Sequence, residues 1–250
     1  MTILAKMNWS FKKIIKYFLD KIPFAFTKNQ EYDLLTEKII LKTCSTNSLC
    51  VDIGSHDGKI LKLFIKHCHK KMHYAFEPIP SLYALLKRKY GSAAKIFSIA
   101  LSNKKGKSTF QHIITNTAYS GLKKRELASK DIIKEIDVEM NLLDNIILPT
   151  DKIDLIKLDI EGGEYEALEG ASNTIIRCKP IILFEFGKGA ANYYEVTPEK
   201  MYHLFRNKFQ YQINTLQGFL NQLKPITIED FTSYYSTGKE YFFIAYTIIK

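Results

Sequence analysis

Carboxylic acids follow two apolar segments in the second half of the chain, at residues 153–158 and 181–184. They are Asp159, Glu161, Glu164 and Glu185. If both segments are neighbouring strands of a parallel sheet, the acids lie close together, because the carboxyl ends of parallel strands meet at one edge. Crowded carboxylates raise one another's proton affinity, so one of them can act as a base near neutral pH. Such a base assists transfer of a group to an alcohol, which must lose its proton around the transition state.

Two acids in this region have a simpler interpretation. Glu164 and Glu166 begin a predicted helix at residues 164–169, where the helix dipole favours solvated acids. This interpretation is the stronger one for Glu166 and stays open for Glu164. The candidate catalytic residues are Asp159, Glu161 and Glu185. A hard divalent cation such as Mg²⁺ is compatible with such oxygen ligands, but no ligand spacing in the sequence requires one.

A glycine-containing turn earlier in the chain is typical of a nucleoside site. Residues 49–53 are apolar around Asp52 and run into Gly54, with Gly58 four residues later. Glycines between a strand and a helix let the backbone approach a ligand closely. Glu77 ends the next apolar segment, where an acid can bind ribose hydroxyls. The G-x-x-x-G spacing differs from the G-x-G-x-x-G of dehydrogenases, and no G-K-[ST] phosphate loop follows. For the turn alone, an ordinary tight connection is the simpler interpretation.

The candidate residues can lie close together only in a fold that brings the ends of the strands together. The sequence predicts such a fold. The expected strands are residues 49–53, 72–76, 95–100, 153–158, 181–184, 209–214 and 241–247, and the expected helices are residues 59–69, 81–90, 164–169 and 198–207. Such alternation is typical of an α/β fold, with a parallel sheet and crossover helices. Residues 107–139 interrupt the alternation. The extended segments 108–115 and 134–139 predict an antiparallel insertion there.

The first 46 residues are predicted to form a helical extension that precedes a domain at residues 47–250. Apolar side chains recur at the spacing of one helix face; they are Phe11, Ile14, Ile15, Phe18 and Leu19. Lys12, Lys13 and Lys16 occupy the opposite face, and a second helix is expected at residues 31–42. The helix packs on the core in the simpler interpretation. In the other, residues 9–19 form a lid or a peripheral membrane contact, since Trp9 and the lysines resemble an interfacial helix.

The composition is that of an ordinary globular chain. Of 250 residues, 46% are hydrophobic and 25% charged, which excludes a disordered or fibrous protein. The net charge of +10 favours anionic partners, but the lysines spread along the chain and argue against nucleic acid. No apolar run spans a membrane, and no secretory signal is visible. The four cysteines contain no C-x-x-C pair, so the sequence predicts reduced thiols, no zinc site and a cytoplasmic protein.

The motifs together resemble class I S-adenosylmethionine-dependent methyltransferases, and more narrowly the FkbM family. The resemblance covers about residues 48–246 and rests on a series of short segments. These are V-D-I-G at 51–54, F-E-P at 76–78, A-L-S at 100–102, the string I-K-L-D-I-E-G-G-E-Y-E-A-L-E-G at 156–170, and I-L-F-E at 182–185. The resemblance implies a Rossmann-like sheet of seven strands in the order 3-2-1-4-5-7-6.

The resemblance also implies cofactor-binding roles for these motifs. Asp52 and Gly54 would line the methionine portion of S-adenosylmethionine, and Glu77 would hold the ribose hydroxyls. Ala100 and Leu101 would flank the adenine. The set is completed by Ser55, His56 and Gly58, which follow the first motif, and by Pro78 of the second; Ser55 and His56 would contribute through the loop backbone.

The implied activity is methyl transfer from S-adenosylmethionine to a hydroxyl of a small molecule or a glycan, such as a sugar, a polysaccharide or a secondary metabolite. Methyltransferases that act on base or amide nitrogen usually carry Asn/Asp-Pro-Pro-aromatic where this chain has Asp159-Ile160-Glu161-Gly162, which favours an oxygen nucleophile. Two alternatives stay open at this point. One is an N-methyltransferase that acts on protein or nucleic acid, and the other is a non-catalytic module that retains the nucleoside pocket.

Overall fold

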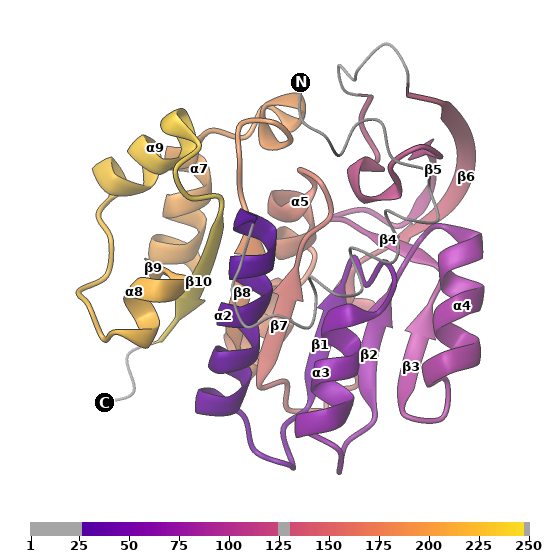
Figure 1. The fold of residues 1–250 in the computed structure, drawn as a ribbon, viewed down its shortest axis with the longest axis horizontal. Helices are drawn as coiled ribbons and strands as arrows, with labels where there is room; N and C mark the ends of the chain where they lie inside the picture. The colour runs from indigo at the N-terminus through magenta and orange to yellow at the C-terminus, as the bar shows by residue number, and fades with distance from the viewer. Residues whose placement is uncertain (1–26, 125–130, 248–250) are drawn as a thin grey trace.

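A seven-stranded sheet forms the centre of the protein (Figure 1). The computed structural model describes residues 27–124 and 131–247, so the predicted helix along residues 9–19 lies outside the described residues. The sheet order is β3-β2-β1-β7-β8-β10-β9. Its strands are β1 (Cys50–Ile53), β2 (His73–Phe76), β3 (Ala94–Phe97), β7 (Leu155–Leu158), β8 (Ile181–Glu185), β9 (Gln212–Thr215) and β10 (Phe242–Tyr246).

The topology confirms the predicted fold class and strand order. Numbered along the chain within this sheet, the strands run 3-2-1-4-5-7-6. Strands β3, β2, β1, β7 and β8 are parallel, and β10 is antiparallel to both β8 and β9. The central strands β1, β2 and β7 are buried along their whole length, as expected for strands covered on both faces. The carboxyl ends of the parallel strands therefore meet at one edge of the sheet.

Helices cover both faces of the sheet. One face packs against α2 (Lys28–Thr43), α3 (Lys59–His67), α4 (Pro80–Tyr90) and α8 (Leu216–Leu220). The other packs against α5 (Glu164–Glu169), α6 (Ser172–Cys178), α7 (Pro198–His203) and α9 (Ile228–Thr237). Successive strand residues point to opposite faces, so Leu155 joins the first core and Ile156 the second. No helix within residues 27–124 and 131–247 is long and apolar enough to cross a membrane.

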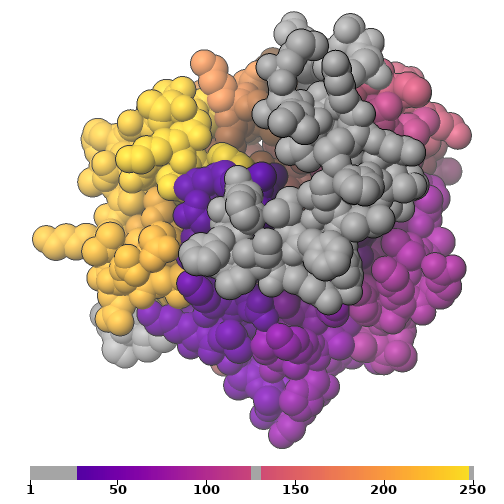
Figure 2. All heavy atoms as spheres, viewed as in Figure 1, coloured from indigo at the N-terminus to yellow at the C-terminus, as the bar shows by residue number. Residues whose placement is uncertain are grey.

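Helix α2 lies against the C-terminal part of the chain, as the space-filling view shows in indigo and yellow (Figure 2). Its N-terminal turn is tied there by polar contacts. Lys28 Nζ and the Tyr32 hydroxyl both donate to the Glu240 carboxylate, at 2.9 and 2.7 Å. The Tyr241 hydroxyl donates to Asn29 at 2.5 Å. These contacts place Tyr32 and Tyr241 beside the carboxyl edge of the sheet.

The insertion forms a second sheet of three strands in the order β4-β6-β5. Its strands are β4 (Ile99–Leu101), β5 (Gly106–Ile113) and β6 (Ile133–Asn141). The β5–β6 pair is antiparallel, as predicted, but β4 joins β6 in parallel. The predicted single strand at residues 95–100 is therefore wrong, because β3 pairs with β2 and β4 leaves for the second sheet after Ser98. Both parts are apolar, so the pattern alone shows no break.

The sequence reasoning missed three helices, and α7 is shorter than predicted. Helix α9 begins with a capping box between Thr227 and Asp230, a signal that is visible in the sequence. Helices α6 and α8 are only 7 and 5 residues long, which leaves little helical periodicity to detect. After α7 the chain continues as a π-helix, η5 (Leu204–Phe209).

Candidate active site

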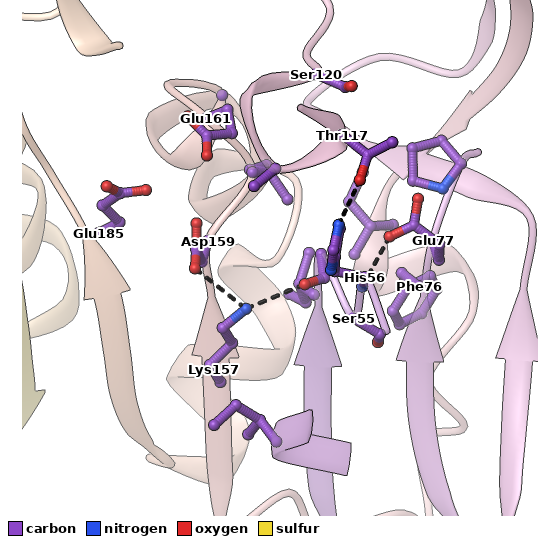
Figure 3. A pocket seen from close by; sticks show the side chains of 18 of the residues that line it. Ser55, His56, Phe76, Glu77, Thr117, Ser120, Lys157, Asp159, Glu161 and Glu185 are labelled. Atoms are coloured by element: carbon purple, nitrogen blue, oxygen red, sulfur yellow. Dashed lines mark hydrogen bonds and ion pairs between the residues drawn. The ribbon is translucent and has the colours of Figure 1, made fainter. Parts of the chain in front are cut away.

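A cavity of about 360 Å³ opens at the carboxyl edge of the sheet. This volume lies at the lower end of the range for small-molecule pockets. Its walls come from the turns after β1 and β2, the start of β4, the loop after β7, the end of β8 and the insertion (Figure 3). Of the predicted site residues, ten line it, which are Gly54, Ser55, His56, Glu77, Pro78, Ala100, Leu101, Asp159, Glu161 and Glu185.

The turn after β1 depends on the absence of a side chain at Gly54. The backbone there has φ +77°, and the N–H groups of Gly54 and Ser55 both donate to the Phe76 carbonyl at 3.0 Å. A Cβ at Gly54 would lie 1.9 Å from the carbonyl oxygen of Asp159. Only glycine therefore allows the β1 turn to pass so close to the end of β7. This close approach brings the predicted nucleoside turn against the acidic cluster.

Glu77, at the end of β2, is buried at 4% exposure and held by backbone donors. Its Oε2 accepts from the N–H of His56 at 2.8 Å, and its Oε1 accepts from the N–H of Ile79 at 2.9 Å. Burial raises the pKa of Glu77 to about 7, against the opposing effect of these hydrogen bonds. An ionised carboxylate has about four acceptor positions, so about two remain for hydroxyl donors from a ligand.

Lys157 is a buried cation at the floor of the cavity, with 7% exposure. Its Nζ donates to the carbonyl of Gly54 at 3.0 Å and lies 3.3 Å from the Asp159 carboxylate (Figure 3). Asp52, its direct neighbour across β1 and β7, is 3.9 Å away. Burial acts to lower the pKa of Lys157, but the charges of Asp159 and Asp52 outweigh it and raise the pKa. Lys157 is therefore charged and neutralises part of the acidic cluster.

The three candidate catalytic acids meet at the mouth of the cavity. Asp159, Glu161 and Glu185 each place one carboxylate oxygen within 4.8 Å of the others. Burial acts to raise the pKa of Asp159, but the charge of Lys157 and a hydrogen bond with Glu185 outweigh it, so the pKa is lowered. Burial, followed by the charges of Asp159 and Glu161, raises the pKa of Glu185 well above its ordinary value. Of the two acids, Glu185 therefore has the higher proton affinity.

Two residues that line the cavity also have an unusual backbone conformation. His56 and Glu161 line it with φ of +48° and +62°, in the left-handed region that non-glycine residues rarely adopt. The other non-glycine residues with positive φ in the described ranges follow helix ends, where this conformation is common; they are Lys179, Glu195, Gln210 and Gln222. Strained conformations away from helix ends are concentrated at functional sites. His56 and Glu161 fit that pattern.

Three acids or glycines singled out in the sequence lie outside the cavity lining. Asp52 is fully buried behind Lys157, and burial raises its pKa. Gly58 adopts φ +84° at the start of α3, where a Cβ would press on Leu86 and Tyr90. Glu164 is 1% exposed, and its Oε1 accepts from the backbone N–H groups of residues 160 and 162. These residues therefore shape the turns from behind the site, and Glu164 is not a solvated helix acid.

Some residues at the cavity were missed by the sequence reasoning. Lys157 had a visible signal, because a charged residue interrupts an otherwise apolar buried strand. The insertion contributes Thr117, whose Oγ1 lies 2.7 Å from His56 Nε2, and also Ser120. Tyr194 and Tyr241 complete the wall from segments far along the chain. The folding of the insertion brings Thr117 and Ser120 there, η4 (Ala191–Tyr194) brings Tyr194, and Tyr241 directly precedes β10; no local pattern in the sequence specifies that these segments meet.

Comparisons with known proteins identify the family and the fold of the chain. The family described as "Methyltransferase FkbM domain" matches residues 52–220. Methyltransferase FkbM from Methylobacillus flagellatus KT is similar in structure, with a TM-score of 0.50 and 16% identity, over 81% of this chain and 44% of that one. This chain thus spans less than half of that protein. At this identity the likeness shows the fold. A comparison with curated proteins finds no match.

Two other solved structures are less similar to the chain. Precorrin-6y C5,15-methyltransferase from Geobacter metallireducens GS-15 has a TM-score of 0.45 and 11% identity, over 91% of this chain and 97% of that one. The N-terminal domain of human METTL16 in complex with SAH has a TM-score of 0.43 and 11% identity, over 92% and 73%. The family match covers more than half of the present chain and includes the turn after β1 and the acidic segment after β7. The chain therefore belongs to the FkbM family of S-adenosylmethionine-dependent methyltransferases.

Proposed function

We propose that this protein transfers a methyl group from S-adenosylmethionine to a hydroxyl of a small molecule or a glycan, such as a sugar, a polysaccharide or a secondary metabolite. The observation that carries the proposal is the cluster of Asp159, Glu161 and Glu185 at one end of a cavity whose other end holds Glu77. A proton acceptor and a nucleoside-binding acid thus face the same space. A proton acceptor in that position would assist methylation of an alcohol.

The residues around Glu77 fit the nucleoside part of the cofactor. Its buried carboxylate has acceptor positions left for the two ribose hydroxyls. The backbone of Gly54, Ser55 and His56 borders the same space. The adenine would lie along the wall formed by Pro78, Ala100 and Leu101, which are part of the same lining. When bound, S-adenosylmethionine supplies an electrophilic methyl group on a sulfonium.

Each acid of the cluster has its own role in this proposal. Lys157 keeps Asp159 ionised, so that Asp159 can accept a hydrogen bond from the substrate hydroxyl and orient its oxygen. Glu185 has the higher proton affinity of the pair and accepts the hydroxyl proton when it is itself ionised. Glu161, in its left-handed conformation, adds a third carboxylate next to them. The turnover number should therefore rise with pH until Glu185 is ionised.

A screen of acceptors tests the proposal. The full-length chain is incubated with S-adenosylmethionine labelled in the methyl group and with paired acceptors that differ only in carrying a hydroxyl or an amine at the same carbon. We expect label on hydroxyl acceptors such as sugars and polyols. Label confined to amine acceptors would refute O-methylation. Binding of the cofactor without transfer to any acceptor, across sugars, polysaccharides and secondary metabolites, would favour the non-catalytic module.

A divalent cation is not needed for this assignment, although the spacing of the three carboxylates is compatible with one. The ammonium group of Lys157 already lies 3.3 Å from Asp159 and supplies a positive charge there. We therefore expect that adding Mg²⁺ to metal-depleted enzyme leaves the turnover number unchanged. A rate that rises with added Mg²⁺ and saturates would assign the acids to a metal site instead.

The cofactor affinity should depend on pH through Glu77. Burial raises the pKa of Glu77 to about 7. The ionised carboxylate offers more acceptor positions to the ribose hydroxyls than the protonated form does. Lowering the pH from 8 to 6 protonates most of this carboxylate, so the affinity for S-adenosylhomocysteine should fall by about tenfold. Isothermal titration calorimetry of wild-type protein at both pH values measures this.

The variant Glu77→Gln separates this effect from other titrating groups. It should bind weakly at both pH values and show a nearly flat pH dependence. Glu77→Ala at pH 8 should lose at least about tenfold in affinity, since hydrogen bonds to a charged group contribute about 1.5–3 kcal/mol. Glu169→Gln, an acid outside the cavity lining, is the matched control and should behave as wild type. A pH dependence that persists in Glu77→Gln would show that another group is responsible.

A further inference from the structure

Three cysteines that are distant in sequence meet at the amino edge of the sheet, opposite the candidate active site. Cys44 ends α2, Cys50 is the first residue of β1, and Cys68 ends α3. In Figure 1 these are the lower ends of α2, β1 and α3, where the loops between them gather. The three sulfur atoms all lie within 4.8 Å of one another, and Cys50 Sγ is 4.0 Å from Cys68 Sγ.

This spacing fits three ligands around one metal ion. Zinc–sulfur bonds of about 2.3 Å in a tetrahedral arrangement place neighbouring sulfur atoms about 3.8 Å apart. A disulfide would require about 2.05 Å, and all three cysteines are free. Thiolate sulfur selects soft or borderline ions such as Zn²⁺ over Mg²⁺ or Ca²⁺. The geometry therefore needs only small side-chain movements to hold Zn²⁺.

The surroundings favour a cation at this point. Cys44 and Cys68 both cap the C-terminal ends of helices, α2 with 16 residues and α3 with 9, and the helix dipole places partial negative charge there. Bare thiolates beside two helix C-termini repel that negative charge, and a bound cation would remove the repulsion.

The site is built and also accessible. Cys50 and Cys68 are fully buried, while Cys44 is half-buried and gives an ion a path from solvent. The backbone N–H of Cys50 donates to Nδ1 of His73 at 3.2 Å, and this hydrogen bond holds Cys50 in place. The aromatic ring of Phe64 packs on His73 at 5.9 Å between ring centroids. Two of the three ligands thus sit on rigid, packed elements.

We propose that Cys44, Cys50 and Cys68 form a Zn²⁺ site, with water from the Cys44 side in the fourth position. Each thiol that becomes a ligand forms a sulfur–zinc bond and releases its proton, without any change of oxidation state. The site would tie the ends of α2 and α3 to the start of β1 and so stabilise the fold. It lies away from the cavity and does not depend on the proposed methyl acceptor. The sequence prediction of no zinc site considered only the spacing of the cysteines along the chain.

Titration of the full-length, reduced, metal-free protein with Zn²⁺ tests the proposal. We expect one Zn²⁺ per chain, an affinity that rises with pH because protons are released, and a higher melting temperature with Zn²⁺ than without. Co²⁺ in place of Zn²⁺ should give a thiolate charge-transfer absorption band. Absence of stoichiometric binding in the wild-type protein would overturn the proposal without any variant.

Two matched variants locate the site. Cys44→Ser removes the half-buried ligand and should weaken Zn²⁺ binding by more than about 100-fold, since loss of an outer-shell contact alone costs about 10–100-fold. Cys178→Ser changes the remaining cysteine, which packs in the core on the opposite sheet face, and should bind Zn²⁺ as wild type does. Equal loss in both variants would overturn the assignment. So would a reduced protein that ignores Zn²⁺ but forms a Cys50–Cys68 disulfide on mild oxidation.

Discussion

Replacing Asp159 by Asn, or Glu185 by Gln, should lower the turnover number by about 10²–10⁴-fold at saturating substrate, because general-base assistance contributes that much. The two carboxylates lie close together in the cavity and differ in proton affinity, so each change removes one of the two groups that would orient and deprotonate the hydroxyl. The affinity for S-adenosylhomocysteine should change by less than about tenfold, since Glu77 and the β1 turn supply the nucleoside contacts. Single-turnover rates with labelled cofactor measure the first effect, and calorimetry measures the second.

The pH dependence of the turnover number tests the base role more sharply than the loss of activity in the variants does. The pKa of Glu185 is raised, so the wild-type rate should increase as the pH rises through that pKa, and Glu185→Gln should lose this increase. Glu166→Gln is the matched control, because Glu166 lies in the same segment but outside the cavity lining, where it accepts a hydrogen bond from Ser102. It should keep the rate and the pH profile of wild type. Near-full turnover in both Asp159→Asn and Glu185→Gln would rule out a base role for this pair.

A second large effect is expected from Gly54→Ala. The new methyl group would lie 1.9 Å from the carbonyl oxygen of Asp159, so β1 and β7 must move apart at the floor of the cavity. We expect a loss of about 4 kcal/mol or more in the free energy of unfolding, which is in the range of severe core disruptions. For a chain of this size that corresponds to a fall of about 8–16 °C in melting temperature. Thermal unfolding followed by circular dichroism measures it.

Gly238→Ala is the control that isolates the backbone contribution. Gly238 has φ +67°, close to the +77° of Gly54, but nothing in the described chain lies within 4 Å of an added Cβ. This variant should lose only about 1–2 kcal/mol, the cost of a left-handed conformation for alanine. If Gly54→Ala is no more destabilised than Gly238→Ala, the contact between the β1 turn and β7 does not require glycine.

Much of the fold followed from local patterns. Short apolar segments alternating with helical periodicity predicted the parallel sheet, since strands buried on both faces must be apolar throughout. The errors came where apolar character continues across a change of partner. Residues 94–101 are mostly apolar, interrupted only by Lys95 and Ser98, yet β3 pairs with β2 and β4 pairs with β6, because strand pairing is a long-range property. The short helices α6 and α8 were not predicted, because too few of their residues carry a helical periodicity.

The sequence alone determined which residues stand at the carboxyl ends of strands. Gly54, Glu77, Asp159 and Glu185 each follow a recognisable strand, and in a parallel sheet these positions converge whatever the details of packing.

Only the tertiary structure decided how those side chains pair. The register Asp52↔Lys157 buries Asp52 behind the lysine, with its carboxylate 3.9 Å from the lysine Nζ. Glu164 likewise holds the turn from inside. The meeting of Cys44, Cys50 and Cys68 depends on the angle at which α2 and α3 pack on β1. The spacing of residues along the chain specifies where a helix or strand lies and which residues stand at its end. The distances between side chains of different helices and strands arise from packing, which a local sequence pattern does not contain.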